Sequence, residues 1–282
     1  MPSALRQHWP EYLIEAWALG TFMISAALFT ALLEYPGSPL HQAIPNANLR
    51  RAFIGLAMGL TAITLIYSPW GQRSGAHMNP ATTLIFLRLG KIMPWDAVFY
   101  IAGQFIGGLC GVLFSKVLLG AIIAHPSVNY VTTVPGQAGV GVAFMAEAAM
   151  ACGMMLMVLF VTNMPKLARF TGLFAGALVF LYITFEAPLS GMSMNPARTV
   201  ASALPSGIWT SGWIYFTAPV LGMLLAAQFY GLISDSPPRA CPKLHHGMKQ
   251  RCIFCGHPGA DPATNKTSTS QTVASRIRAS FL

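Results

Sequence analysis

Long apolar runs separated by short polar segments are the dominant pattern along this chain. A helix needs about 20 residues to cross the hydrocarbon core of a bilayer, and most of these runs are close to that length or longer. The six runs cover residues 12–33, 50–68, 95–123, 139–162, 168–187 and 210–233. The pattern therefore predicts an all-α membrane protein with six transmembrane helices.

Two further apolar stretches, 79–89 and 195–204, are too short to span a bilayer. Because a helix rises about 1.5 Å per residue, each stretch reaches only about halfway across. Both open on Asn-Pro, which favours a helix start, since Asn is a good N-cap and Pro has a preset φ at the first helical position. We therefore predict two re-entrant half-helices.

The segment around the first Asn-Pro recurs in the second half of the chain. Residues 74–81 read SGAHMNPA, and residues 190–197 read SGMSMNPA. Such a repeat indicates a duplicated unit. We expect a first half-repeat over 1–135, a second over 136–233, and a cytoplasmic tail over 234–282 that is partly disordered because its end is poor in large apolar groups.

Each half-repeat carries one glutamate in its first span, Glu15 and Glu147. Charge inside the hydrocarbon core is costly, so such residues normally face the protein interior and serve a function. For Glu15 the competing interpretation is a side chain near a helix end that reaches water. Glycines at helical spacing in the third and fifth spans predict close packing of helices rather than a functional site. They are Gly103, Gly107, Gly111, Gly172 and Gly176.

Composition and charge support a membrane protein. The chain is 54% hydrophobic and 9% charged, whereas soluble domains carry about a quarter charged residues. With the N-terminus in the cytoplasm, 13 of the 17 basic residues fall on the cytoplasmic side, so the positive-inside rule favours cytoplasmic termini. The exceptions are Arg50, Arg51, Lys116 and Arg198. Topology thus explains the net charge of +9 better than nucleic-acid binding does, and we expect a multi-pass protein of the plasma (inner) membrane.

The two half-helices enter from opposite faces in this topology, as in an inverted-topology repeat. Asn79 and Asn195 then meet near the midplane, each at the positive end of a helix dipole, so the centre repels cations. Their side-chain amides could donate hydrogen bonds to a neutral oxygen. Arg198, about one turn further on, adds a second positive barrier, unless it only anchors the half-helix to a neighbour.

These residues resemble the aquaporin, or major intrinsic protein, family, and we expect a bacterial-type member. The resemblance covers about residues 10–233 and rests on twin Asn-Pro-Ala boxes, the second followed by Arg198, with a glutamate in the first span of each half. The box residues are Asn79, Pro80, Ala81, Asn195, Pro196 and Ala197. The resemblance implies a right-handed bundle with a pore in every subunit and usually a homotetramer. It also implies that Glu15 and Glu147 hold the backbone of the pore loops.

The family's outer constriction has four positions, which the resemblance assigns to Met58, Ile183, Met192 and Arg198, with Gly59 as the neighbouring candidate for the first. The ring is apolar on three sides, and flexible Met side chains can repack around different solutes. Thr199 stands where glycerol-conducting members carry Asp, and Ala203, Tyr215 and Phe216 are closer to the water group. We expect a passive channel for water, and for glycerol, urea or similar neutral solutes as the alternative.

Two other function classes are less favoured. A secondary transporter also uses inverted repeats and broken helices, but it needs a coupling-ion site, and this chain has only one deep acidic residue per half. We predict no enzyme, because no catalytic group of residues is evident. His77, two residues before Asn79, matches a histidine common in the family; it lines the path or makes a structural hydrogen bond. Glu186 is an open hypothesis for a contact with Arg198.

The tail carries residue types that bind zinc. Cys-x2-Cys with a nearby Cys and His has the ligands and roughly the spacing of a tetrahedral site. The candidate ligands are Cys241, His245, Cys252 and Cys255, and His246 and His257 lie close by in the sequence. The competing interpretation is a reduced tail without a ligand, and the predicted channel requires no cofactor.

Overall fold

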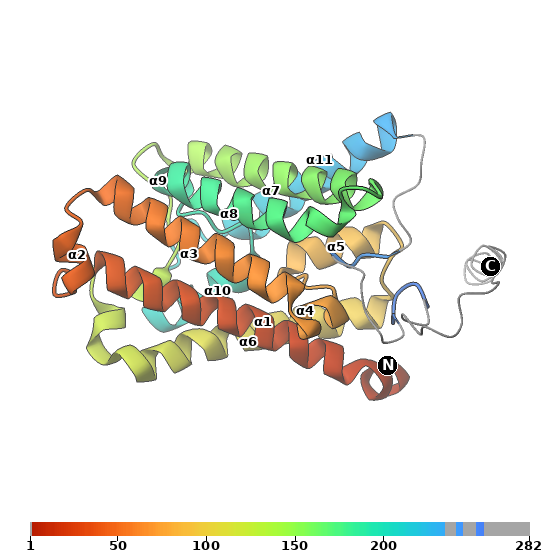
Figure 1. Ribbon diagram of the computed structural model, residues 1–282, viewed down its shortest axis with the longest axis horizontal. Coiled ribbons are helices and arrows are strands. Elements are labelled where there is room, and N and C mark those ends of the chain that lie inside the picture. Colours follow the sequence, from red (N-terminus) through yellow and green to blue (C-terminus); the bar gives the residue numbers. More distant parts are fainter. Residues whose placement is uncertain (1, 235–240, 245–251, 257–282) are drawn as a thin grey trace.

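Six long helices run side by side along one axis (Figure 1). The computed structural model describes residues 2–234, 241–244 and 252–256. The long helices are α1 (Pro2–Glu34), α3 (Ala47–Tyr67), α6 (Pro94–Leu119), α7 (Val140–Asn163), α8 (Thr171–Phe185) and α11 (Ile214–Ile233). Each contributes to a segment long and apolar enough to cross a membrane.

Two short helices follow the repeated Asn-Pro pairs. They are α5 (Pro80–Arg88) and α10 (Pro196–Ser206), and each begins with proline directly after an N-cap asparagine. The predicted fold class of six spans and two half-helices is thus confirmed. The remaining helical segments are α2 (Pro39–Ala43), α4 (Pro69–Ser74), η1 (Gly120–Ala124), η2 (Asn129–Val131), η3 (Ala168–Phe170) and α9 (Ala187–Ser190).

The two ends of the bundle differ in what they contain (Figure 1). Helix α1 begins and α11 ends at one end, which we call the terminal end. Helices α2 and α9 and the segment η2 lie at the other, which we call the far end. Helix α5 lies towards the terminal end and α10 towards the far end, so the half-helices approach the centre from opposite sides.

Helix α1 starts at Pro2, well before the apolar run that begins at residue 12. Its first turns are polar and are held by side chains from the rest of the terminal end. His8 Nδ1 lies 2.9 Å from Asp96 Oδ1, the Tyr12 hydroxyl donates to the same oxygen at 2.6 Å, and Arg73 pairs with Glu11 at 2.9 Å. Hydrophobicity alone therefore predicted too short a helix.

Glycine allows the closest helix contacts, as predicted. A Cβ atom at Gly107 on α6 would lie 2.0 Å from the Ala16 carbonyl oxygen on α1, and one at Gly176 on α8 would lie 2.6 Å from the Gly59 carbonyl oxygen on α3. Such distances are far inside van der Waals contact, so these positions exclude any side chain. The pairs α1–α6 and α3–α8 are therefore packed backbone against backbone.

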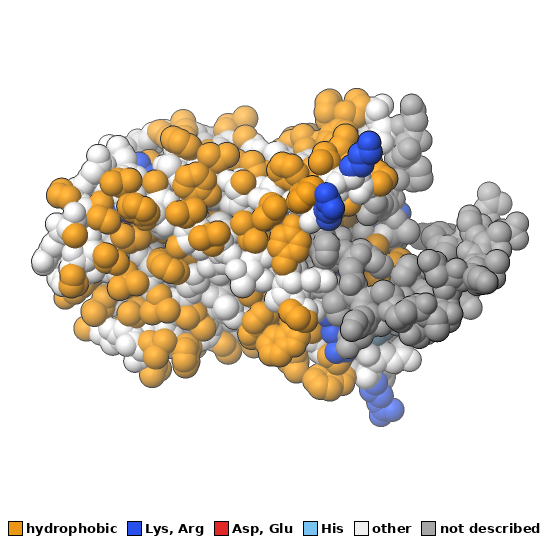
Figure 2. All heavy atoms as spheres, viewed as in Figure 1, with side chains coloured by type: hydrophobic (Ala, Val, Ile, Leu, Met, Phe, Trp, Pro, Cys, Tyr) orange, Lys and Arg blue, Asp and Glu red, His pale blue; other side chains and the backbone are white. Residues whose placement is uncertain are grey.

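The long sides of the bundle present apolar side chains to the surroundings. Orange hydrophobic atoms cover much of the face in Figure 2, whereas the Lys and Arg atoms gather mainly at the terminal end. Val117 and Leu232 are each 81% exposed, which fits a lipid environment and not water. The chain is an integral, multi-pass membrane protein.

Candidate pore

A cavity of about 600 Å³ lies along the centre of the bundle. At the far end its wall includes Glu34 and Arg51, and at the terminal end it includes His77 and Leu244. Most of the other lining residues are apolar, and they come mainly from α1, α3, α7, α8 and α11, from the segment 126–132 and from the loops before the two half-helices. The cavity thus connects the regions of the two ends past the half-helix tips.

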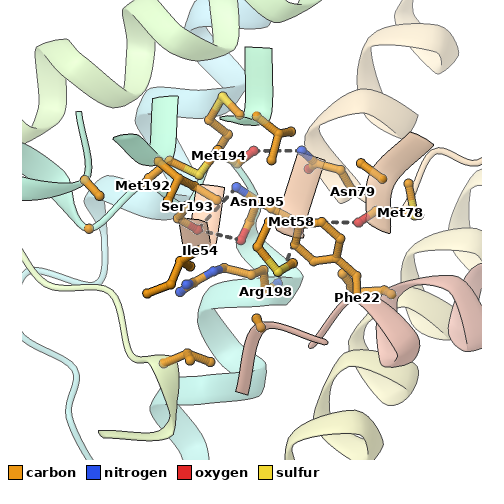
Figure 3. A pocket seen from close by; sticks show the side chains of 18 of the residues that line it. Phe22, Ile54, Met58, Met78, Asn79, Met192, Ser193, Met194, Asn195 and Arg198 are labelled. Carbon is orange, nitrogen blue, oxygen red and sulfur yellow. Dashed lines mark hydrogen bonds between the residues drawn. The ribbon is translucent and has the colours of Figure 1, made fainter. Parts of the chain in front are cut away.

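The tips of the half-helices hold each other through a reciprocal pair of hydrogen bonds (Figure 3). Asn79 Nδ2 donates to the Met194 carbonyl oxygen at 2.7 Å, and Asn195 Nδ2 donates to the Met78 carbonyl oxygen at 2.6 Å. Each asparagine therefore binds the loop that precedes the other. The two loops and half-helices are locked together at the centre of the cavity.

The same asparagines also cap their own helices. Asn79 Oδ1 accepts from the Ala81 amide at 2.9 Å, and Asn195 Oδ1 accepts from the amides of Ala197 and Arg198 at 3.0 and 3.2 Å. An amide NH₂ carries two hydrogens, and the loop carbonyl takes one. Both asparagines line the cavity, so the second hydrogen of each can serve a passing acceptor.

Glu15 holds the first pore loop, by which we mean residues 74–79. Its Oε1 accepts from the Ser74 hydroxyl at 2.7 Å and the His77 amide at 3.0 Å. Its Oε2 accepts from the Met78 amide at 2.7 Å and from Gln104 Nε2 at 2.9 Å. Glu15 is fully buried, so it does not reach water at a helix end.

Glu147 holds the second pore loop, residues 190–195, in the same way. Its Oε1 accepts from the Ser190 hydroxyl and the Ser193 amide, both at 2.7 Å, and its Oε2 accepts from the Met194 amide at 2.6 Å. A carboxylate that accepts several hydrogen bonds can remain buried, because its lone pairs are satisfied. The two glutamates therefore occupy equivalent places in the two halves.

The pore loops contain backbone that only such support can maintain. Four non-glycine residues in the loops have positive φ of 49–54°, a conformation that disfavours L-residues. They are Ala76, Met78, Met192 and Met194. The amides that Glu15 and Glu147 accept belong to Met78 and Met194 themselves and to the residues directly after Ala76 and Met192. The buried carboxylates thus hold a strained backbone in a fixed shape.

Several residues of this framework were missed by the sequence analysis. The Tyr100 hydroxyl donates to the Ser74 carbonyl oxygen at 2.8 Å, and the Tyr215 hydroxyl donates to the Ser190 carbonyl oxygen at 2.5 Å. Gln104, which donates to Glu15, was also missed. The serines open the repeated segment, and each tyrosine lies early in the last span of its half, so comparison of the two halves could have found both pairs.

The four residues assigned to the constriction all line the cavity. Three of them, Met58, Met192 and Arg198, are labelled in Figure 3, and the fourth is Ile183. Met58 and Met192 are buried within the bundle, at 2% and 8% exposure. The wall here combines three apolar side chains with one cation.

The structure also separates the two candidates for the position on α3. Gly59 is absent from the cavity wall among the described residues, because its Cα faces the Gly176 carbonyl oxygen on α8. Met58 is on the cavity side of the same helix turn. The position next to the cavity is therefore Met58.

Arg198 carries the only cationic group of the ring. Its Nη1 is buried and has no hydrogen-bond partner within the described part of the chain. No ion pair joins Arg198 to Glu186 among the described residues, and Glu186 does not contribute to the cavity wall there. A buried guanidinium N–H without a protein acceptor is suited to donate to an oxygen in the cavity. At the equivalent place of the first half-helix stands Thr82.

His77 lines the cavity and makes structural contacts at the same time. Its Nδ1 lies 3.1 Å from Thr83 Oγ1, and its Nε2 lies 3.3 Å from the Pro242 carbonyl oxygen in the C-terminal segment. His77 thus has a place in the cavity wall as well as structural contacts.

The candidate zinc ligands of the tail are brought together in part. The sulfur atoms of Cys241, Cys252 and Cys255 all lie within 4.8 Å of one another. His245, the fourth predicted ligand, lies outside the described residues. The three cysteines come from two segments that are apart in sequence, 241–244 and 252–256.

Comparison with known proteins gives one consistent result. The family described as "Major intrinsic protein" matches residues 6–230. Aquaporin NIP2-2 of Zea mays is 36% identical over 219 residues, covering 76% of this chain and 72% of that protein. Aquaporin NIP6-1 of Arabidopsis thaliana is 33% identical over 225 residues, covering 78% and 71%.

A solved structure has the same fold. The X-ray structure of the aquaglyceroporin from Plasmodium falciparum superposes with a TM-score of 0.68, covering 80% of this chain and 97% of that chain at 20% sequence identity. At that identity the match speaks for the fold alone. The sequence relatives named above are plant proteins, so they do not support the prediction of a bacterial-type member.

Proposed function

Because this chain belongs to the major intrinsic protein family and is an aquaporin-type channel for water and small neutral solutes, we propose that water is its principal permeant. The single observation that carries this proposal is the pair of opposed half-helices whose asparagine tips border the central cavity. The family assignment favours a channel over a secondary transporter, and the protein is not an enzyme.

Water passes the tips by exchanging hydrogen bonds with fixed donors. The Asn79 and Asn195 amides and Arg198 Nη1 are the donors that border the cavity near its centre. Their positions are set by the reciprocal bonds and by the helix caps, so they need no rearrangement when a water molecule arrives. The apolar wall between them binds water weakly, and this lets each molecule leave again.

Exclusion of ions follows from the same geometry. The N-termini of α5 and α10 both point their positive dipole ends at the centre, and Arg198 adds a full positive charge one turn away. Half-helix dipoles and an arginine are a known barrier to protons and cations in aquaporin-type pores. We therefore assign Met58, Ile183, Met192 and Arg198 to the selectivity constriction of this channel.

The ring leaves glycerol and urea as a second candidate. Its three apolar side chains and one donor match a solute with a hydrocarbon side and a hydroxyl or carbonyl on the other side. Met58 and Met192 are unbranched and flexible, so the opening can widen by rotamer changes. Water remains first, because only the smallest solute passes without such a change.

Stopped-flow light scattering on proteoliposomes tests the proposal by comparing water, glycerol and urea. We expect fast shrinkage with a low activation energy for water, and slower entry of both solutes. Met192→Ala should raise glycerol entry relative to water, whereas Met145→Ala, whose side chain is 65% exposed on the outside of α7, should leave the ratio unchanged. A glycerol rate above the water rate in the wild type would reverse the order of the two candidates.

Topology and assembly belong to the same proposal. Basic side chains gather at the terminal end, which supports termini in the cytoplasm and a location in the plasma (inner) membrane (Figure 2). We also propose the homotetramer that the family resemblance implies. Labelling of tags from each side of the membrane checks the orientation, and native mass spectrometry in detergent checks the subunit number.

A further inference from the structure

Three thiols meet at the terminal end in a geometry suited to a metal. Cys241 Sγ and Cys252 Sγ are 3.5 Å apart, and all three sulfur atoms lie within 4.8 Å of one another. A disulfide needs about 2.05 Å. In a tetrahedral zinc site each sulfur lies about 2.3 Å from the ion, so any two sulfur atoms are about 3.8 Å apart. The sulfur–sulfur distances here, from 3.5 Å to at most 4.8 Å, include that value.

Two of these sulfur atoms come from a single turn of the backbone. Cys252 and Cys255 occupy one tight turn, in which the Gly256 amide donates to the Cys252 carbonyl oxygen at 3.0 Å and Gly256 has a φ of 69°. This turn is the Cys-x2-Cys spacing of structural zinc sites. Cys252 is only 2% exposed, and Cys241 approaches it from the other segment.

Both tail segments dock on the first pore loop. The Pro242 carbonyl oxygen lies 3.3 Å from His77 Nε2, and the Leu244 amide donates to the Gly75 carbonyl oxygen at 3.4 Å. The Phe254 ring stacks on His77 at 6.1 Å with an angle of 11° between the planes, and meets Tyr100 edge-on at 5.8 Å. The tail thus binds the loop that Glu15 holds.

Leu244 reaches the pore itself. Its side chain is 7% exposed, lines the central cavity, and joins an apolar cluster with Ile66, Tyr100 and Val158. Lys243 beside it is 6% exposed and packs over Gly75. The segment therefore forms part of the cavity wall at the terminal end, where a channel needs an open path.

We propose that Cys241, Cys252 and Cys255 bind a soft divalent metal ion of the zinc class, and that this ion holds the tail across the terminal mouth. The ion links segment 241–244 to segment 252–256, so its binding free energy adds to the weak docking contacts. A tetrahedral ion held by these three thiols keeps a fourth position for water or another ligand. The closure half of the proposal rests on the proposed function, whereas the metal site does not.

The metal site is tested on the full-length chain in detergent. We expect about one equivalent of zinc by elemental analysis, and the intense visible absorption of tetrahedral thiolate-bound Co²⁺ when Co²⁺ replaces it. Cys252→Ser should abolish both signals. Cys110→Ser and Cys152→Ser, at cysteines within the spans, are the matched controls and should change neither. A missing Co²⁺ spectrum, or one that survives Cys252→Ser, overturns the site.

The closure is tested by water flux in proteoliposomes. We expect protein treated with a chelator to conduct water severalfold faster than zinc-loaded protein. Cys252→Ser should conduct water at the faster rate in both conditions. Phe254→Ala keeps all three thiols but loses the stacking on His77. It should therefore bind Co²⁺ normally and conduct water fast even when loaded with zinc. Phe185→Ala, at a ring that is 73% exposed on the outside of α8, is the control.

The outcomes separate the two halves of the proposal. Equal flux of zinc-loaded and chelated protein overturns the closure. Absence of water flux in every form, including Phe254→Ala, overturns the proposed function and with it the closure. The Co²⁺ spectrum judges the metal site in either case, because it does not depend on conduction.

Discussion

The two pore loops share one framework and differ in the side chains at the mouths. In both, a buried glutamate accepts from a serine hydroxyl and two loop amides, and a tyrosine hydroxyl binds the carbonyl of that serine. In both, an asparagine caps a half-helix and binds the opposite loop. The two halves therefore share the main contacts that fix the loop backbone.

The halves differ at positions that line the cavity. Three residues after the asparagine, the first half-helix has Thr82 and the second has Arg198. Two residues before it, the first loop has His77 and the second has Ser193. Thr82 bonds weakly to the Met223 sulfur at 3.7 Å, whereas Arg198 Nη1 has no protein partner among the described residues. We therefore propose that Arg198 gives the second half-helix a part in selectivity, whereas the first pore loop binds the tail segments.

Removing either glutamate should cause the largest loss of stability, because each glutamate holds the pore loop of its own half. Glu147→Ala leaves two buried amides and a hydroxyl without acceptors, at about 1–3 kcal/mol each, so we expect little folded protein. Glu15→Ala should be as damaging, and Glu147→Gln milder. The monodisperse fraction on size exclusion and the melting temperature measure this. A harmless Glu15→Ala would mean that the halves are not equivalent.

Arg198→Val should change selectivity without unfolding the channel. We expect glycerol entry relative to water to rise severalfold and proton leakage to become measurable, since the charge and the donor are both lost. Thr82→Val at the equivalent position of the first half should alter neither. Stopped-flow scattering and a trapped pH dye give the two readouts. Unchanged selectivity would show that the constriction lies elsewhere.

Gln104→Leu should be a smaller structural change. Gln104 gives Glu15 a donor that Glu147 lacks, but Glu15 Oε2 keeps the Met78 amide at 2.7 Å when Gln104 is removed. The Gln104 Oε1 atom has no partner in the described part of the chain, so its loss costs nothing. We expect about 1 kcal/mol of destabilisation, seen as a small fall in melting temperature. A loss of fold comparable to Glu15→Ala would contradict this.

Glu186→Gln should have the smallest effect. The described structure shows neither an ion pair with Arg198 nor a place for Glu186 in the cavity wall. We expect water permeability to change by less than about twofold, a difference worth only a few tenths of a kcal/mol. A large change would require a contact between this carboxylate and the conducting water.

The sequence predicted the six spans and both half-helices because their signals are local. Length and hydropathy identify a span, and Asn-Pro marks the first turn of a half-helix at positions 79–80 and 195–196. The sequence could not distinguish Met58 from Gly59 at the constriction, because it does not show which of two neighbouring residues on a helix faces the cavity. That choice needed the contact of Gly59 with α8.

Long-range contacts of the tail could not be predicted for a related reason. Pro242 and His77 are 165 residues apart, and no repeat or periodicity links them. The cysteine spacing suggested a metal site, but the place of these thiols beside the first pore loop depends on how the tail folds back. The start of α1 was likewise hidden, since polar contacts with Asp96 and Arg73 extend the helix beyond its apolar run.

We propose that water passes between the half-helix tips and through the ring that contains Met192. It is tested by the water permeability of Met192→Trp in proteoliposomes treated with a chelator, measured beside Met145→Trp, whose side chain is 65% exposed on the outside of α7. The bulky indole should fill the ring and reduce flux to that of protein-free vesicles, whereas Met145→Trp should conduct like the wild type. Undiminished flux through folded Met192→Trp would show that water does not pass through this ring.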